Sequence, residues 1–191
     1  MIRTNRPRRA SALSIMLAGA VALGACGSSS TGSSNPSSGT ATTAQILPVT
    51  DNPITNDSTV DTLSIDSVLV ENNEDPATGT AVDDHLEIAL TNTGAQTLSN
   101  FEVFYTFGDP TTDTTESYYL QLPDTFTIAA GATRVAHFDD TGAADHFPVN
   151  KYSLYATSTN ALDVTVVVSA EGAAVQTTTV QKDAAGPEEA D

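Results

Sequence analysis

Aspartates and histidines that could do chemistry gather at three places in the sequence. These are Asp83-Asp84-His85, Asp139-Asp140 and Asp145-His146. Calcium takes about six to eight oxygen ligands from carboxylates, amides and carbonyls, and loops at one end of a fold could assemble such a set. The five aspartates are therefore candidate calcium ligands, although their spacing does not match an EF-hand loop. The alternative is a group of solvated acidic loops in an acidic protein.

Histidines offer a second candidate site, because three imidazoles can hold zinc or copper. The chain contains His85, His137 and His146, and it has no His-x-x-x-His pair. A metal site would therefore require the fold to join segments that are far apart in the sequence. The alternative is that each imidazole is exposed or half-buried and binds no metal.

The usual sequence signatures of catalysis are missing. The chain has no Gly-x-Ser-x-Gly nucleophile elbow and no Ser-x-x-Lys motif. It has no glycine-rich phosphate loop, and no pair of carboxylates can be assigned to glycoside cleavage. We therefore expect a protein that is not an enzyme. A hydrolase is the weakest alternative, since abundant Ser and Asp make a chance Ser/His/Asp set uninformative.

Tyrosines could form a platform for a sugar. Tyr118 and Tyr119 are adjacent, and Tyr105, Tyr152 and Tyr155 complete the set. In a strand, Tyr118 and Tyr119 would face opposite sides, so one is expected in the core and the other at the surface. Structural packing is the alternative role.

The N-terminal segment predicts where the protein works. Residues 1–9 carry four arginines and no acid, and residues 10–23 are mostly apolar. A basic region, a short apolar region and small residues at a cleavage site are typical of a secretory signal peptide. The apolar run is shorter than the roughly 20 residues that a membrane-spanning helix needs.

The sequence Leu23-Gly24-Ala25-Cys26 ends this segment and resembles the lipobox of bacterial lipoproteins. The resemblance implies cleavage before Cys26 and attachment of diacylglycerol to its thiol. Two or three acyl chains would hold the protein on the membrane, since each buried CH₂ contributes about 0.8 kcal/mol. The expected location is the extracytoplasmic face of the cell membrane. The alternative is a plain signal peptide with a cysteine that is there by chance.

The net charge excludes one class of partner. The full chain carries −17, and removal of residues 1–25 leaves three basic residues against 24 acidic ones, a formal charge of −21. Such a surface repels phosphate backbones, which excludes nucleic acid, and it repels anionic lipid headgroups. A cationic partner, a divalent cation or a salty habitat would all suit this charge. Cys26 is the only cysteine, so no internal disulfide or thiolate metal site is expected.

Composition divides the chain into four parts. They are a signal peptide (1–25), a Ser/Thr/Gly-rich tether (26–58), a folded domain (59–182) and a disordered acidic tail (183–191). The tether cannot bury enough apolar surface to fold and is expected to behave as a flexible coil. Its last residues, 46–58, could pack as an early strand, although Pro48 and Pro53 argue against a central one.

Within the domain, apolar residues recur at every second position, which is the period of a strand with one buried face. The runs lie at 63–70, 86–90, 101–107, 118–122, 126–128, 134–138, 152–156, 164–168 and 175–179. The last two predict the clearest hairpin. No longer helical period is present, and residues 139–146 could make one short helical turn. These features predict an all-β fold, an antiparallel Ig-like β-sandwich, with a closed barrel as the alternative.

Part of the domain resembles a family. The sequences LEIALTNTG at 86–94, FEVFY at 101–105 and IAAG at 128–131 are similar to bacterial Ig-like domains of the CARDB type. The resemblance implies an adhesion, spacer or accessory module, and it brings no catalytic residues. The sequence thus predicts a membrane-anchored, non-enzymatic binding module with an envelope or extracellular protein as its partner. The alternative is a calcium- or glycan-binding lipoprotein.

Overall fold

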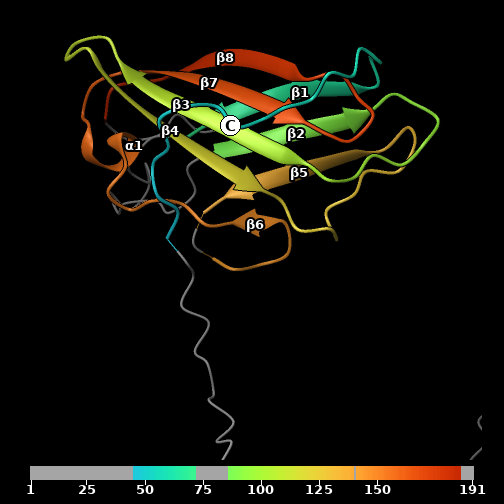
Figure 1. The fold of residues 1–191 in the computed structure, drawn as a ribbon. Helices are drawn as coiled ribbons and strands as arrows, with labels where there is room; N and C mark the ends of the chain where they lie inside the picture. Colours follow the sequence, from blue (N-terminus) through green and yellow to red (C-terminus); the bar gives the residue numbers. More distant parts are fainter. Residues whose placement is uncertain (1–44, 72–85, 140, 186–191) are drawn as a thin grey trace, which may run out of the picture. The chain divides into compact units, whose positions relative to one another are not determined.

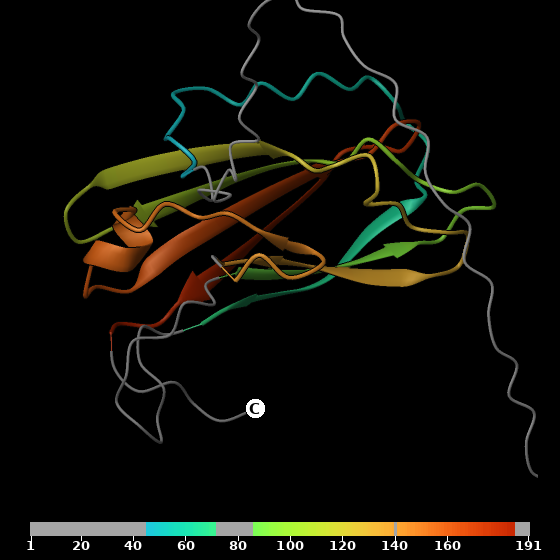
Figure 2. The ribbon, with the colours of Figure 1, turned by 90° about the horizontal axis from the view of Figure 1, so that it is seen from below.

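The computed structural model describes residues 45–71, 86–139 and 141–185, which form two four-stranded sheets and one short helix (Figure 1). The first sheet has the order β1-β2-β5-β6, with β1 at Leu63–Val70, β2 at Leu86–Asn92, β5 at Thr133–Phe138 and β6 at His146–Phe147. The second has the order β4-β3-β7-β8, with β4 at Thr114–Gln121, β3 at Glu102–Asp109, β7 at Leu162–Ser169 and β8 at Gln176–Lys182. Figure 2 shows the two sheets as separate layers. The predicted signal peptide and Cys26 lie outside the described residues.

The strand order is that of an immunoglobulin-like sandwich. Every strand pair is antiparallel except β5–β6. Strands β1, β2 and β5 follow the order of A, B and E, and β4, β3, β7 and β8 follow the order of C′, C, F and G. The predicted all-β sandwich is therefore confirmed. No helix in the described residues is long and apolar enough to cross a membrane.

The core is built from alternate residues of both sheets. Strand β2 buries Leu86, Ile88 and Leu90, and β7 buries its three alternate valines in the same way. The Tyr105 and Phe138 rings, from β3 and β5, meet across the two layers at 5.5 Å between centroids. Period-two patterning in the sequence thus becomes one shared apolar layer. The predicted β7–β8 hairpin is confirmed, with Gly172 in its turn at φ +78°.

The prediction of a strand at 152–156 is wrong. This segment forms a turn and then the helix α1, Leu154–Thr157, with the side chain of Ser153 accepting a hydrogen bond from Ala156 N. Tyr152 is 76 % exposed, whereas Tyr155 is buried, contacts the Phe107 ring at 5.6 Å and donates from its hydroxyl to Glu71 O at 2.6 Å. The residue that anchors this segment is therefore Tyr155, which the assumed alternation placed on the outward side.

Two further local predictions fail. The described part of 139–146 contains a turn, closed by His146 N donating to Ala143 O, but no helix. This turn returns the chain to β6, whose parallel pairing with β5 fixes its path. At 126–128 the structure has only an isolated bridge, between Ile128 and Leu98, in place of a strand.

The end of the predicted tether contacts the sandwich from residue 45 onward. Val49 N donates to Ser117 O on the outer edge of β4, and Gln45 Nε2 donates to Asn150 Oδ1 at 2.6 Å. Ile46 packs against the core. The early strand considered for 46–58 is thus reduced to a single bridge at Val49.

Asn92, in the sequence that resembles CARDB domains, ties the end of β2 to two loops. The side chain is fully buried, and its Nδ2 donates to Gln96 O at 2.7 Å and Ile128 O at 2.8 Å. Its Oδ1 accepts from Gly94 N at 2.9 Å. A Cβ at Gly94 would lie 2.8 Å from the side chain of Thr62, so this position has no room for a larger residue. The Asn-x-Gly pattern is therefore explained by packing and hydrogen bonding.

Lys182 is a buried cation at the end of β8. It is fully buried, its Nζ donates to Asp183 O at 3.2 Å, and it lies 5.3 Å from the centre of the Tyr155 ring. Burial lowers the pKa of Lys182, and the nearby Asp183 opposes that shift only in part. The charged form of Lys182 is therefore less favourable in the folded protein than in the unfolded chain.

We predict that Asn92→Ala lowers the free energy of unfolding by about 2–4 kcal/mol, because it removes three hydrogen bonds, to Gln96 O, to Ile128 O and from Gly94 N. Urea denaturation measures this. Thr93→Ala, at the adjacent exposed residue, is the matched control and should change stability by less than about 0.5 kcal/mol. An Asn92→Ala variant as stable as the control would contradict the role given to Asn92.

We predict that the stability of the protein rises with pH as the pH approaches 10. Between the lowered pKa of folded Lys182 and the ordinary value, only the unfolded chain keeps the proton, so unfolding takes up a proton and becomes less favourable as pH rises. The stability of the Lys182→Met variant should not rise with pH in this range. The stability of the Lys151→Met variant, which changes an exposed lysine, should rise as in the wild type. Urea denaturation at several pH values measures the three slopes, and equal slopes would rule out the linkage.

Candidate functional site

Four of the residues singled out in the sequence come together beside β5 and β6. They are His137, His146, Asp139 and Asp145. The other candidates, Cys26, Asp83, Asp84, His85 and Asp140, lie outside the described residues. The structure thus joins two of the three predicted clusters, as far as it describes them.

The two histidines stack face to face. His137 in β5 is the parallel partner of His146 in β6, so both side chains leave the sheet on its outer face. Their ring centroids are 4.6 Å apart and their planes are inclined by 10°. A pairing of only two residues between β5 and β6 is therefore reinforced by contact between the imidazoles.

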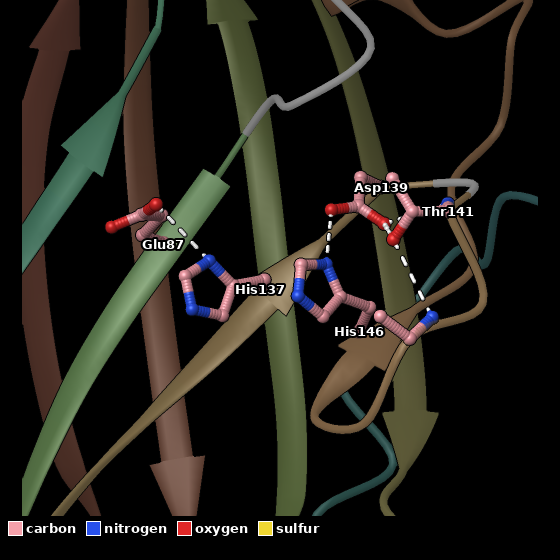
Figure 3. A network of polar contacts seen from close by, with 6 residues as sticks. Glu87, His137, Asp139, Thr141 and His146 are labelled. Carbon is pink, nitrogen blue, oxygen red and sulfur yellow. Dashed lines mark hydrogen bonds and ion pairs between the residues drawn. The ribbon is translucent and has the colours of Figure 1, made fainter.

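A carboxylate flanks each imidazole, so that Glu87, His137, His146 and Asp139 form a row (Figure 3). Glu87 reaches His137 because β2 pairs the two residues directly. Nδ1 of His137 lies 3.0 Å from Oε1 of Glu87, although the two are not aligned as a hydrogen bond. Nδ1 of His146 hydrogen-bonds Oδ2 of Asp139. Both imidazoles thus face an acid through the same nitrogen.

Asp139 is the most buried member of the row. Its side chain is 1 % exposed, and its Oδ1 accepts from both the amide and the hydroxyl of Thr141, each at 2.8 Å. Burial raises the pKa of Asp139, but the hydrogen bonds from Thr141 and His146 outweigh burial, so the pKa is lowered. Asp139 is therefore held as a carboxylate that closes the loop leading to β6.

Both carboxylate oxygens of Asp145 accept hydrogen bonds from Arg134. Nε of Arg134 donates to Oδ2 of Asp145 at 2.8 Å, and a second guanidinium nitrogen donates to Oδ1. The guanidinium also donates to Thr127 O and lies 4.3 Å above the Phe126 ring. The hydrogen bond from Arg134 lowers the pKa of Asp145, with His137 and His146 adding to the effect. Asp145 adopts φ +65°, a conformation that aspartate tolerates better than most residues.

The hydrogen bonds of Asp139 and Asp145 make these two residues less suitable as calcium ligands. Both oxygens of Asp139 and both oxygens of Asp145 accept hydrogen bonds from protein donors. Within residues 45–71, 86–139 and 141–185, no three His, Cys, Asp or Glu side chains group closely enough to hold a metal ion. A calcium site that uses Asp83, Asp84 and Asp140 stays a prediction.

The row also contains two of the three groups of a serine hydrolase triad, the carboxylate and the imidazole. A carboxylate that hydrogen-bonds an imidazole orients it, as in a serine hydrolase triad. Over the described ranges, no serine or threonine hydroxyl hydrogen-bonds either His137 or His146. Among the described residues, a hydrogen bond from a carboxylate orients His146, and no hydroxyl nucleophile is bonded to either imidazole.

Sequence reasoning missed Glu87 and Arg134 as members of this cluster. Glu87 occupies an outward position in β2, whereas Arg134 lies near the start of β5 on the same face as the buried Ala136 and Phe138. Both strands were predicted, but the partners of these residues depend on which segments are neighbours. The Asp139-x-Thr141 spacing is typical of an Asx turn and could have identified the loop.

We predict that Asp139→Asn lowers the free energy of unfolding at pH 7 by about 1.5–3 kcal/mol, the range for hydrogen bonds to a charged group. Because the folded pKa of Asp139 is lowered, its contribution is full above pH 3.8 and is lost as pH falls through the folded value. The variant should therefore lose less stability than the wild type on acidification below pH 4.

Asp124→Asn, at an exposed aspartate, is the matched control and should follow the wild type. Thermal denaturation between pH 2 and pH 7 compares the three proteins. The assignment of Asp139 would be wrong if Asp139→Asn and Asp124→Asn gave the same pH profile.

No protein-family model matches this chain, and no curated protein matches it either. Three features of the chain itself therefore indicate its function: the N-terminal sequence pattern, the sandwich that follows it and the surfaces that the sandwich presents.

Proposed function

We propose that this chain is a lipid-anchored β-sandwich of a bacterial cell envelope, which acts on the extracytoplasmic side by binding a partner and not by catalysis. The observation that carries the proposal is Leu23-Gly24-Ala25-Cys26 after a basic and then an apolar segment. This order matches the lipobox of lipoproteins. Attachment through two or three acyl chains would keep the domain at the membrane.

The folded domain supports a binding role. Its strands follow the order of immunoglobulin-like modules, and the resemblance to CARDB domains implies adhesion or accessory functions. Such sandwiches present two outer sheet faces and two sets of loops to partners. The Ser/Thr/Gly-rich tether between Cys26 and residue 45 would give the domain reach from the membrane.

Charge narrows the class of partner. After cleavage, the three bases are Arg134, Lys151 and Lys182. Arg134 is paired with Asp145 and Lys182 is buried, so the exposed charge of the domain is almost wholly negative. A partner would therefore be neutral or cationic, such as a basic protein surface or an uncharged glycan, and not a nucleic acid.

We predict that Cys26→Ser abolishes incorporation of a labelled fatty acid and moves the protein from the membrane fraction to the soluble fraction. The reason is that a hydroxyl cannot replace the thiol as the site of acylation. Expression in a bacterial host, followed by fractionation and detection of the label, measures both effects. Ser28→Ala, two residues away in the tether, is the control and should stay labelled and membrane-bound.

The proposal fails if the wild-type protein takes up no label and the Cys26→Ser variant fractionates with membranes as the wild type does. Such a result would mean that membrane association depends on something other than lipid at Cys26.

A further inference from the structure

A segment of the predicted tether is fixed against one end of the second sheet. Nδ2 of Asn56 donates to Ser169 Oγ at 2.9 Å, Ala170 O at 3.1 Å and Ala173 O at 3.0 Å. Its Oδ1 accepts from Ser58 N at 2.9 Å. With every polar atom of its side chain engaged, Asn56 holds this part of the chain beside the β7–β8 turn.

A polar groove lies between this segment and the sheet. Its volume is about 260 Å³, and its lining includes Asn56, Asn100, Glu102, Ser169 and Glu171. The groove brings together three parts of the chain, since Glu171 N in the β7–β8 turn also donates to Ser99 O before β3. Its volume is close to the lower limit of about 300 Å³ for small-molecule sites. The groove therefore has room for a ligand of about one sugar ring.

The lining supplies acceptors that are only partly used. Oε1 of Glu102 accepts from the Tyr119 hydroxyl at 2.6 Å, and Oε2 of Glu171 accepts from Nδ2 of Asn100 at 2.5 Å. The second oxygen of each carboxylate has no hydrogen bond from the described residues. Ionised carboxylates accept strong hydrogen bonds from hydroxyl groups. Two such oxygens beside amides and a serine suit a ligand that carries several hydroxyls.

Tyr119 contacts the groove lining through Glu102, from the outer face of the sheet. It lies beside Glu102 through its hydroxyl, and it is the cross-strand neighbour of Phe104. Burial, together with the hydrogen bond to Glu102, raises the pKa of Tyr119 to about 12, so its hydroxyl remains a donor at neutral pH. As expected from the adjacent pair, Tyr118 is in the core and Tyr119 is on the outer side.

Anions and metal ions fit this groove less well. An anion would meet two carboxylates and no basic side chain in the lining. A metal ion would need three close ligands, and the part of the chain that the structure describes contains no such group. A ligand with hydroxyls and no negative charge satisfies both constraints.

We infer that the groove between Asn56 and Glu171 binds a single ring of an uncharged carbohydrate, with Glu102 and Glu171 accepting hydrogen bonds from its hydroxyls. The inference rests on the proposed binding role and names the class of ligand for it. It does not depend on the lipid anchor.

Calorimetric titration of the full chain, in a detergent without a sugar headgroup, tests the inference. The probes are the methyl glycosides of glucose, galactose, mannose and N-acetylglucosamine, with spermidine and calcium chloride as non-sugar probes. At least one glycoside should bind, with a Kd on the order of 1 mM for so small a site. Glu171→Gln and Glu102→Gln should each weaken this binding by about tenfold or more.

Asp163→Asn is the matched control, because Asp163 is an exposed acid of β7 outside the groove lining. It should bind the same glycoside as the wild type does. The inference is overturned if no glycoside binds, if binding occurs only with spermidine or calcium, or if the glutamine variants bind as well as the control. Fatty-acid labelling of the same preparation separates this failure from failure of the proposed anchor.

Discussion

Each sheet of the domain has one apolar face, and neither face is stable in water unless the other covers it. Alternate residues of β2 and β5 meet alternate residues of β3 and β7, and Tyr105 contacts Phe138 across this layer. Once the layer forms, the loops must join strands of opposite sheets at fixed separations. Polar residues secure the connecting segments: the buried Asn92 joins β2 to two loops, and the half-buried Asn56 joins the tether to the β7–β8 turn. Both candidate surfaces depend on this packing and on these polar contacts.

The two surfaces lie on different sheets and differ in chemistry. On the outer face of the first sheet, the row from Glu87 to Asp139 makes its polar contacts within the protein, and it secures β6, which has little backbone pairing of its own. Both oxygens of Asp139 accept hydrogen bonds, whereas Nδ1 of His137 faces Glu87 without one. At one end of the second sheet, Glu102 and Glu171 in the groove each keep an acceptor oxygen to which no described residue donates. A buried carboxylate such as Asp139, with both oxygens paired, stabilises the protein, whereas partly paired carboxylates at the surface are available to a ligand. This difference is why we assign structure to the histidine row and binding to the groove.

Most of the fold could be predicted because strand periodicity is local. The alternation at 86–90, 101–107 and 164–168 depends only on which face of each strand is buried, and the structure confirms it. The prediction at 152–156 was wrong because so short an apolar pattern is compatible with both the strand period and the helix period. The contact of Tyr155 with Phe107 favours the turn and helix that the structure has. The histidine row could be predicted only in part. Its residue types were recognised, but the pairing of Glu87 with His137 and the stacking of His137 on His146 depend on strand order.

The central claim is that lipid on Cys26 holds this sandwich outside the cell, with the acidic domain carried on a polar tether. Mass spectrometry of the N-terminal peptide of the mature protein, isolated from its own membranes, tests it most directly. We expect a peptide that begins at Cys26 and carries the added mass of diacylglycerol, with or without a further acyl group on its amine. A mature chain that begins at another residue, or that carries an unmodified Cys26 thiol, would contradict the account.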